Sequence, residues 1–314
     1  MGLKLKLLKY PSVFVVYDRN VEDYALKIAG SKPSLAIDAT EENKTMDTVL
    51  KIDRWLLNSG ADRKSLLLAI GGGITTDIAG FAASIYKRGI RYANIPTTLL
   101  AQVDAATGGK TGVNLDSYKN MLGAFQLPEF VHIDTDILRT LPKRELLSGA
   151  AEMLKIFIID DRDSYYNTLK VLSEGADPAA LEPLVKKAAK IKWKMVKRDL
   201  RDEGRRMVLN LGHTYGHAVE WWQRSHAVAD PYTHGEAVAI GIATAARKSE
   251  EQGIAKPGLA AKIKADLEYC GLPTELPCPE EDLNAAIEND KKAFGGKLNF
   301  VFIKDIGSVV VKKI

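Results

Sequence analysis

The stretch 66–81, LLLAIGGGITTDIAGF, decides the fold class because three glycines join a short apolar run to a helical pattern. The run has the length and aliphatic content of a buried strand, and glycines let the backbone turn tightly and approach a ligand. Thr75, Thr76 and Asp77 are expected to cap a helix whose positive end favours a phosphate. Thr76 stands where the dinucleotide fingerprint requires a third glycine. The stretch therefore predicts either a phosphate-binding loop of another type or a plain strand-to-helix turn.

Strand and helix patterns alternate around this stretch. VFVVYD (13–18), SLLLAI (65–70), YANIP (92–96) and FVHID (130–134) are brief apolar runs that end near Asp, Gly or Pro, which is typical of buried strands. Helical spacing covers 21–29, 45–58 and 75–87. Alternating strands and helices predict a parallel sheet. We therefore expect an α/β domain over residues 1–141.

The pattern becomes mainly helical after residue 141. Helical segments are predicted at 144–158, 178–199, 211–223, 235–252, 257–269 and 280–289. LNFVFI (298–303) and SVVVKK (308–313) flank a turn-prone Asp305-Ile306-Gly307 and predict a closing hairpin. We expect a second, mainly α-helical domain over residues 142–314.

Composition excludes several classes of protein. In 314 residues, 44 Lys and Arg against 40 Asp and Glu leave a net charge of +4, too small to predict nucleic-acid binding. Two cysteines, Cys270 and Cys278, form no disulfide framework, which favours a reducing, cytoplasmic setting. The longest apolar stretch, 237–246, is about half of the roughly 20 residues that span a bilayer. We expect no membrane partner and no nucleic-acid partner.

Three of the five histidines lie within 22 residues, at His213, His217 and His234. The i, i+4 spacing of His213 and His217 places them on one helix face and suggests two zinc ligands, although unrelated surface histidines would show the same spacing. Glu152 and Lys155 lie in the otherwise apolar SGAAEMLKIF. They form either a surface ion pair or a buried site, in which the carboxylate completes a His-His-Glu metal centre.

A third polar cluster lies in IPTTLLAQVDAATGGKTGVNLDSYKNMLGAF (95–125), which is too polar for a core and too rich in glycine for a helix. We expect a loop that suits an anionic ligand. Its candidate residues are Asp104, Lys110, Asn114, Lys119 and Asn120. Lys192, Arg206 and Asn210 add further donors for a phosphate or a carboxylate.

Together these motifs resemble the 3-dehydroquinate synthase family, sugar-phosphate cyclases of the shikimate pathway of aromatic amino acid biosynthesis. The resemblance rests on GGGITTDIAGF, YKRGIRYANIPTTLLAQVDAATGGKTGVN, KNMLGAF, LPKRELLSGAAEMLK, LNLGHTYGHAVE, HGEAVAIG and the terminal DKK with FVFIKDIG. It implies a Rossmann-like NAD-binding domain followed by a helical metal- and substrate-binding domain, in a homodimer.

The resemblance also implies a role for each candidate residue. The metal, zinc or alternatively cobalt, would be bound by Glu152, His213 and His234, with His217 beside it as a catalytic residue and not a ligand. The NAD contacts would be Asp18, Glu41, Lys44, Gly72, Gly73, Ile74, Thr75, Thr76, Asp77, Thr97, Thr98, Lys110, Lys119 and Thr140. Catalytic or substrate contacts would be Asp104, Lys110, Asn120, Lys155, Lys192, Arg206 and Asn210, with Lys291 or Lys292. Arg88 would act across the dimer interface.

The implied reaction converts 3-deoxy-D-arabino-heptulosonate 7-phosphate, an anionic sugar-acid phosphate, to 3-dehydroquinate and phosphate. The substrate is transiently oxidised at C5 by NAD, phosphate is eliminated, the NADH formed returns its hydride to C5, and an intramolecular aldol closure forms the ring. Two features depart from the family pattern. Ile74-Thr75-Thr76 replaces a glycine-aspartate pair, and the longer spacing from His213 to His234 can move the third metal ligand. The alternatives are a sugar-phosphate cyclase of secondary metabolism and a metal-dependent polyol dehydrogenase.

Overall fold

The computed structural model describes residues 2–116, 118–293 and 299–313, with only the backbone described for 288–293. The chain divides into two compact units, Met1–Leu138 and Arg139–Ile314. Among the described residues, no helix is both long and apolar enough to cross a membrane.

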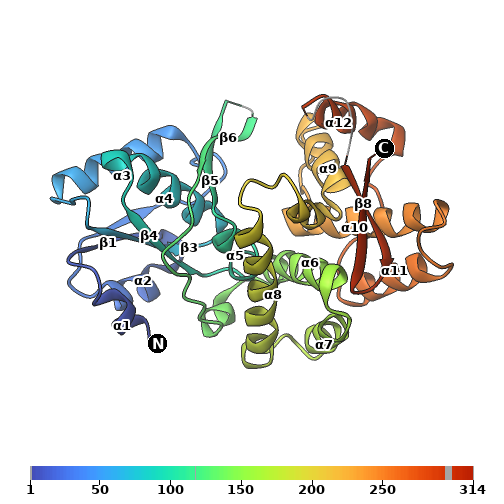
Figure 1. Cartoon of the computed structure of the whole chain (residues 1–314), viewed down its shortest axis with the longest axis horizontal. Helices are drawn as coiled ribbons and strands as arrows, with labels where there is room; N and C mark the ends of the chain where they lie inside the picture. Colours follow the sequence, from blue (N-terminus) through green and yellow to red (C-terminus); the bar gives the residue numbers. More distant parts are fainter. Residues whose placement is uncertain (1, 117, 294–298, 314) are drawn as a thin grey trace. The chain divides into compact units, whose positions relative to one another are not determined.

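The first unit is built on a four-stranded parallel sheet (Figure 1). The strands β1 (Val13–Asp18), β2 (Ser34–Ile37), β3 (Leu66–Gly71) and β4 (Arg91–Pro96) lie in the order β2-β1-β3-β4. Three of the four predicted strands are confirmed, and β2 was not predicted. The expected strand at 130–134 is wrong: the segment forms one isolated bridge, between Val131 and Asn94, with backbone hydrogen bonds to β4 only between Asn94 and residues 130 and 132.

Helices cover both faces of this sheet, since alternate side chains of each strand point to opposite sides. Val16 and Leu67 pack with α3 (Met46–Asn58) and α4 (Gly73–Ile85), whereas Val15 and Leu68 pack with α2 (Glu22–Ala29) on the other face. Short helices α1 (Leu3–Leu7) and α5 (Leu99–Val103) complete the unit. The predicted helices at 21–29, 45–58 and 75–87 are confirmed within two residues at each end.

The expected loop at 95–125 is wrong: its first half contains α5, and its second half forms an antiparallel hairpin of β5 (Lys110–Leu115) and β6 (Tyr118–Phe125). Gly112 pairs with Gly123, and a Cβ on Gly123 would lie 2.2 Å from the carbonyl oxygen of Thr111. The backbones therefore approach so closely that only glycine fits. The polar composition concealed the hairpin because most of β6 is exposed.

The second unit is mainly helical, as predicted. It contains α6 (Lys143–Asp160), α7 (Arg162–Ser173), α8 (Pro178–Arg198), α9 (His213–Ser225), α10 (His234–Glu251), α11 (Leu259–Tyr269) and α12 (Glu280–Ala293). The predicted closing hairpin is present as β7 (Asn299–Asp305) and β8 (Ser308–Lys313), while α7 was not predicted. These elements complete the Rossmann-like plus helical fold class inferred from the sequence.

Helix α10 forms the centre of this unit (Figure 1). Its residues 237–246 are all buried, and a Cβ on Gly241 would lie 1.8 Å from the carbonyl oxygen of Gly212, immediately before α9. This close approach brings the start of α9 against α10. Glu280 fastens α12 to the same pair of helices, because it accepts hydrogen bonds from Tyr215 of α9 and from Arg247 of α10.

Candidate metal centre and nucleotide-binding loop

Glu152, His213 and His234 converge in the second unit, with one ligand atom from each lying within 4.8 Å of the others. Glu152 projects from the middle of α6, while His213 and His234 are the first residues of α9 and α10. The Oε1 atom of Glu152 lies 3.3 Å from Nε2 of His234 and 3.7 Å from Nε2 of His213. The structure therefore brings together the three residues predicted to bind the metal.

Local sequence sets where the two histidines lie. Gly212, with φ of 78°, occupies the left-handed region before His213 and packs against the backbone of α10, where a Cβ would lie 2.9 Å from the Val238 carbonyl. Thr233 begins α10 with a capping box: its hydroxyl accepts from the Glu236 amide, and the Glu236 carboxylate accepts from the Thr233 amide. Each histidine is therefore the first helical residue, directly after an N-cap residue that fixes where its helix begins.

The Glu152 carboxylate is 1% exposed, and neither oxygen has a hydrogen-bond partner of good geometry. Lys155 Nζ lies 2.6 Å from Oε2, but its angle does not make it a satisfactory donor. Burial alone would raise the pKa of Glu152, yet the charge of Lys155 and the two histidines hold that pKa well below its ordinary value. An ionised, incompletely satisfied carboxylate facing two imidazoles is a donor set that fits zinc.

The two histidines differ in charge. Burial, reinforced by the nearby Lys155 ammonium, keeps the pKa of His213 well below its ordinary value, so its ring is neutral. Its Nδ1 lies 3.2 Å from the Leu211 carbonyl, which leaves Nε2 toward Glu152. Burial opposes protonation of His234 too, but the neighbouring Glu152 and Glu220 carboxylates raise its pKa to about 10. Without a metal, a proton on His234 balances the carboxylates.

His217 lies beside this cluster and not within its convergent atoms. Its ring centre is 5.1 Å from that of His213 and 6.4 Å from that of His234, and its side chain is exposed. Sequence reasoning missed Glu220, whose Oε1 lies 3.6 Å from Nδ1 of His234. Glu220 follows His213 by seven residues, so its position on the same face of α9 was a signal that could have identified it.

The glycine loop of the first unit joins β3 to α4 without a side-chain cap. Gly72 is the N-cap residue, and the expected capping by Thr75, Thr76 and Asp77 is wrong, because the helix begins at Gly73 and these side chains lie beyond its first residues. The Thr76 hydroxyl donates to the Gly73 carbonyl, and a Cβ on Gly71 would lie 2.4 Å from the Thr75 hydroxyl oxygen. The first amides of α4 consequently have no side-chain cap.

Three other predicted nucleotide contacts, Asp18, Thr97 and Thr98, lie near this loop. Asp18 ends β1, beside β3, and Thr97 follows β4 with its amide bonded to the Gly71 carbonyl at 2.9 Å. Thr98 caps α5 and would lie 3.1 Å from a Cβ on Gly72. In the order β2-β1-β3-β4, β2 is added on one side of β1 and β3 on the other, so the order of the strands reverses between β1 and β3. Ligands of open α/β sheets bind at the carboxyl ends of the strands at such a reversal point.

A polar network connects α4 with the hairpin. Buried Lys44 donates to Asp77 at 2.7 Å and to Asn120 at 2.6 Å. The side-chain amide of Asn114 donates to the Glu41 carboxylate at 2.9 Å, and the Lys119 ammonium lies 3.9 Å from the same carboxylate. A cavity of about 310 Å³ lies beside this network, lined by Asp77, Lys110, Asn120 and hairpin residues. The structure therefore brings together Glu41, Lys44, Asp77, Lys119 and Asn120.

The remaining predicted residues lie in both units. Lys155, Lys192 and Arg206 are buried cations of the second unit, and Asn210 ends the η5 turn (Arg205–Asn210) exposed. Ile74 lies in the first turn of α4, Asp104 follows α5, Arg88 lies exposed in a turn with φ of 69°, and Thr140 ends a short 3-10 helix exposed. The side chains of Lys291 and Lys292 lie outside the described residues.

Solved structures define the fold as that of the sugar-phosphate cyclases. ValA, a 2-epi-5-epi-valiolone synthase from Streptomyces hygroscopicus subsp. jinggangensis 5008 solved with NAD+ and Zn2+ bound, superposes with a TM-score of 0.87 at 27% identity, over 98% of this chain and 88% of that chain. A 2-deoxy-scyllo-inosose synthase complexed with carbaglucose-6-phosphate, NAD+ and Co2+ reaches 0.85 at 26%, over 97% and 88%.

Sequence comparison defines the family. Models of the N-terminal and C-terminal domains of 3-dehydroquinate synthase match residues 34–148 and 149–293. The 3-dehydroquinate synthase of Geotalea uraniireducens (strain Rf4) is 41% identical over 99% of this chain and 86% of its own length, and that of Pyrococcus abyssi (strain GE5 / Orsay) is 42% identical over 91% and 83%. The chain belongs to the 3-dehydroquinate synthase family, which confirms the resemblance inferred from its motifs.

Proposed function

We propose that this chain is a carbon–oxygen lyase that converts 3-deoxy-D-arabino-heptulosonate 7-phosphate to 3-dehydroquinate and phosphate. One observation carries the proposal: a buried, ionised glutamate with poorly satisfied oxygens faces two imidazole nitrogens, in a chain 41% identical to a 3-dehydroquinate synthase. The ValA structure contains NAD+ and Zn2+, and the 2-deoxy-scyllo-inosose synthase complex contains NAD+ and Co2+.

Glu152, His213 and His234 would hold zinc, or cobalt in its place. When bound, the metal supplies Lewis-acid polarisation of a substrate hydroxyl and NAD supplies a reversible hydride acceptor. His217, exposed and 5.1 Å from the His213 ring, is proposed to move a proton of the substrate. Lys155 keeps Glu152 ionised, because its buried ammonium lies 2.6 Å from the carboxylate.

We propose that the first unit binds NAD at the reversal point of its sheet. The uncapped amides at the start of α4 suit the pyrophosphate, since a helix N-terminus attracts anions. Asp18 at the end of β1 is proposed to contact the nucleotide, together with Lys44 and Asp77. We propose an NAD-binding domain over residues 1–141 and a metal- and substrate-binding domain over residues 142–314.

An anionic substrate needs cationic side chains, and Lys192 and Arg206 are buried cations of the second unit. Arg206 donates to the Leu200 carbonyl and is proposed to bind the substrate carboxylate as well, with Lys192 as a further contact. Lys110, Asn120, Asp104, Asn210 and one of Lys291 and Lys292 are proposed as further contacts. Arg88 is proposed to reach the phosphate in a second copy, in a cytoplasmic homodimer.

A phosphate-release assay tests this function. Purified protein with NAD and zinc should release phosphate from the heptulosonate phosphate with no net NADH, and a chelator should abolish the release. Sedoheptulose 7-phosphate and glucose 6-phosphate serve as matched substrates that lack the carboxylate. Turnover of either in preference to the sugar acid would assign the chain to another cyclase. Accumulation of NADH with glycerol would instead indicate a polyol dehydrogenase.

A further inference from the structure

Helices α6 and α10 are joined by three successive contacts, one of which lies within the proposed metal site. On α6 the residues are Arg144, Ser148 and Glu152, spaced four apart and therefore on one face. They meet three consecutive residues at the start of α10: Glu236, Gly235 and His234, respectively. The position of His234 relative to Glu152 is thus coupled to the other two contacts.

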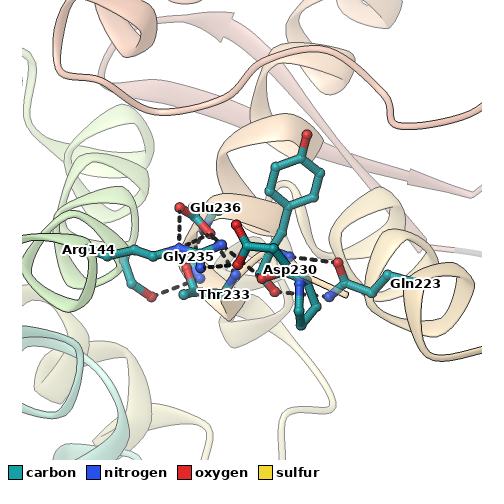
Figure 2. A network of polar contacts seen from close by, with 9 residues as sticks. Arg144, Gln223, Asp230, Thr233, Gly235 and Glu236 are labelled. Atoms are coloured by element: carbon teal, nitrogen blue, oxygen red, sulfur yellow. Dashed lines mark hydrogen bonds and ion pairs between the residues drawn. The ribbon is translucent and has the colours of Figure 1, made fainter. Parts of the chain in front are cut away.

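Arg144 and Glu236 form a bidentate ion pair (Figure 2). Nε of Arg144 donates to Oε1 at 3.0 Å and Nη2 donates to Oε2 at 2.9 Å. The Glu236 side chain is 15% exposed and also accepts from the Thr233 amide at 2.7 Å. A carboxylate held by these donors has no need of a metal ion, so Glu236 supports the site without being a ligand.

The same arginine fixes the loop that precedes His234. Nη2 of Arg144 donates to the Pro231 carbonyl at 2.8 Å, and the Gln223 side chain pairs with both the amide and the carbonyl of Tyr232 (Figure 2). This loop lies between His213 and His234 in the sequence. The ion pair of Arg144 with Asp230 contributes little, because Asp230 is 85% exposed.

We propose that Arg144 and Glu236 are positioning residues for the metal ligand His234. The inference rests on the proposed function, because it assumes that Glu152, His213 and His234 bind the metal. The planar guanidinium spans both carboxylate oxygens, whereas a lysine ammonium offers a single point charge. The bidentate ion pair therefore fixes both the orientation of the first turn of α10 and its distance from α6.

Zinc affinity measured by chelator competition, with the visible spectrum of Co2+-loaded protein as a second readout, tests the proposal. Arg144→Ala should lower zinc affinity by about 10- to 100-fold, as losses of outer partners of metal ligands do, and should alter the Co2+ bands. Arg144→Lys should recover only part of the affinity. The double variant Arg144→Ala, Glu236→Gln should bind zinc no more weakly than the single variant with the lower zinc affinity, because both substitutions disrupt the same ion pair.

Arg162→Ala is the matched control. Arg162 is likewise half-exposed and makes a 2.9 Å ion pair, with Asp305, that touches no proposed ligand. It should change zinc affinity less than two-fold. If Arg144→Ala does not fold, Glu236→Gln decides the question alone. A zinc affinity of the Arg144→Ala or Glu236→Gln variant within two-fold of the wild-type value, with an unaltered Co2+ spectrum, would overturn the positioning role while leaving the proposed function intact. Wild-type protein that takes up neither metal would overturn both.

Discussion

Gly235→Ala should damage the proposed metal centre without changing any ligand. The added Cβ would lie 1.9 Å from the Ser148 carbonyl oxygen and 2.5 Å from its carbon, and real Cβ atoms essentially never come within 3.0 Å of a non-bonded atom elsewhere in the chain. These are backbone atoms of α6, so no side chain can rotate away. The start of α10 must move away from α6 by about 1.1 Å, the difference between 3.0 and 1.9 Å.

That displacement exceeds the tolerance of a metal site. Ligand distances in metal centres hold to about 0.2 Å, and His234 is the residue immediately before Gly235. The movement also strains the bond from the Gly235 amide to the Ser148 hydroxyl, now 3.0 Å. Overpacking costs about 1–3 kcal/mol and the hydrogen bond about 1 kcal/mol. We expect zinc affinity to fall at least about 10-fold, the equivalent of 1.4 kcal/mol.

The assay is zinc titration by chelator competition, together with urea unfolding of the metal-free protein. Leu267→Ala is the control, because Leu267 is fully buried in α11 and its truncation should cost about 2–5 kcal/mol. The control should lose at least as much stability and keep its zinc affinity. Gly235→Ala protein with wild-type zinc affinity would refute the reasoning, since α10 would then have absorbed the methyl group without moving His234.

Three further predictions concern other residues. His217→Ala should retain zinc in metal analysis but turn over more slowly, whereas Glu152→Gln should lose both bound zinc and activity. Loss of zinc from the His217→Ala variant would make His217 a ligand. Burial alone would raise the pKa of Glu280, but hydrogen bonds from three neighbours lower it to about 2, so its stabilisation should disappear as pH falls from about 4.5 toward 2. Glu280→Gln should therefore flatten the decline of the urea midpoint over that range, and a curve parallel to wild type would contradict this. Mixed dimers of Arg88→Ala and Lys155→Ala subunits should regain part of the activity if Arg88 acts across an interface, and verified mixed dimers without recovery would exclude that role.

Local periodicity predicted most of the fold. The buried strands of the first unit are uninterrupted apolar runs because helices cover both faces of the sheet, so their composition identified β1, β3 and β4. The hairpin β5–β6 lacked this signal, since most of β6 is exposed and its close Gly112–Gly123 pairing has no periodic pattern. Short strand β2 was missed because four residues carry too little periodicity.

The sequence by itself determined the family, the glycine loop and the identity of the candidate ligands, because these depend on residue types in a fixed order. Spacing alone favoured His213 and His217, which share a helix face. Only the tertiary structure decided that His213 and His234 converge on Glu152, and that Arg144 pairs with Glu236, two residues after His234. Arg144 and Glu236 are 92 residues apart, and contacts across such distances follow from helix packing, which no local pattern records.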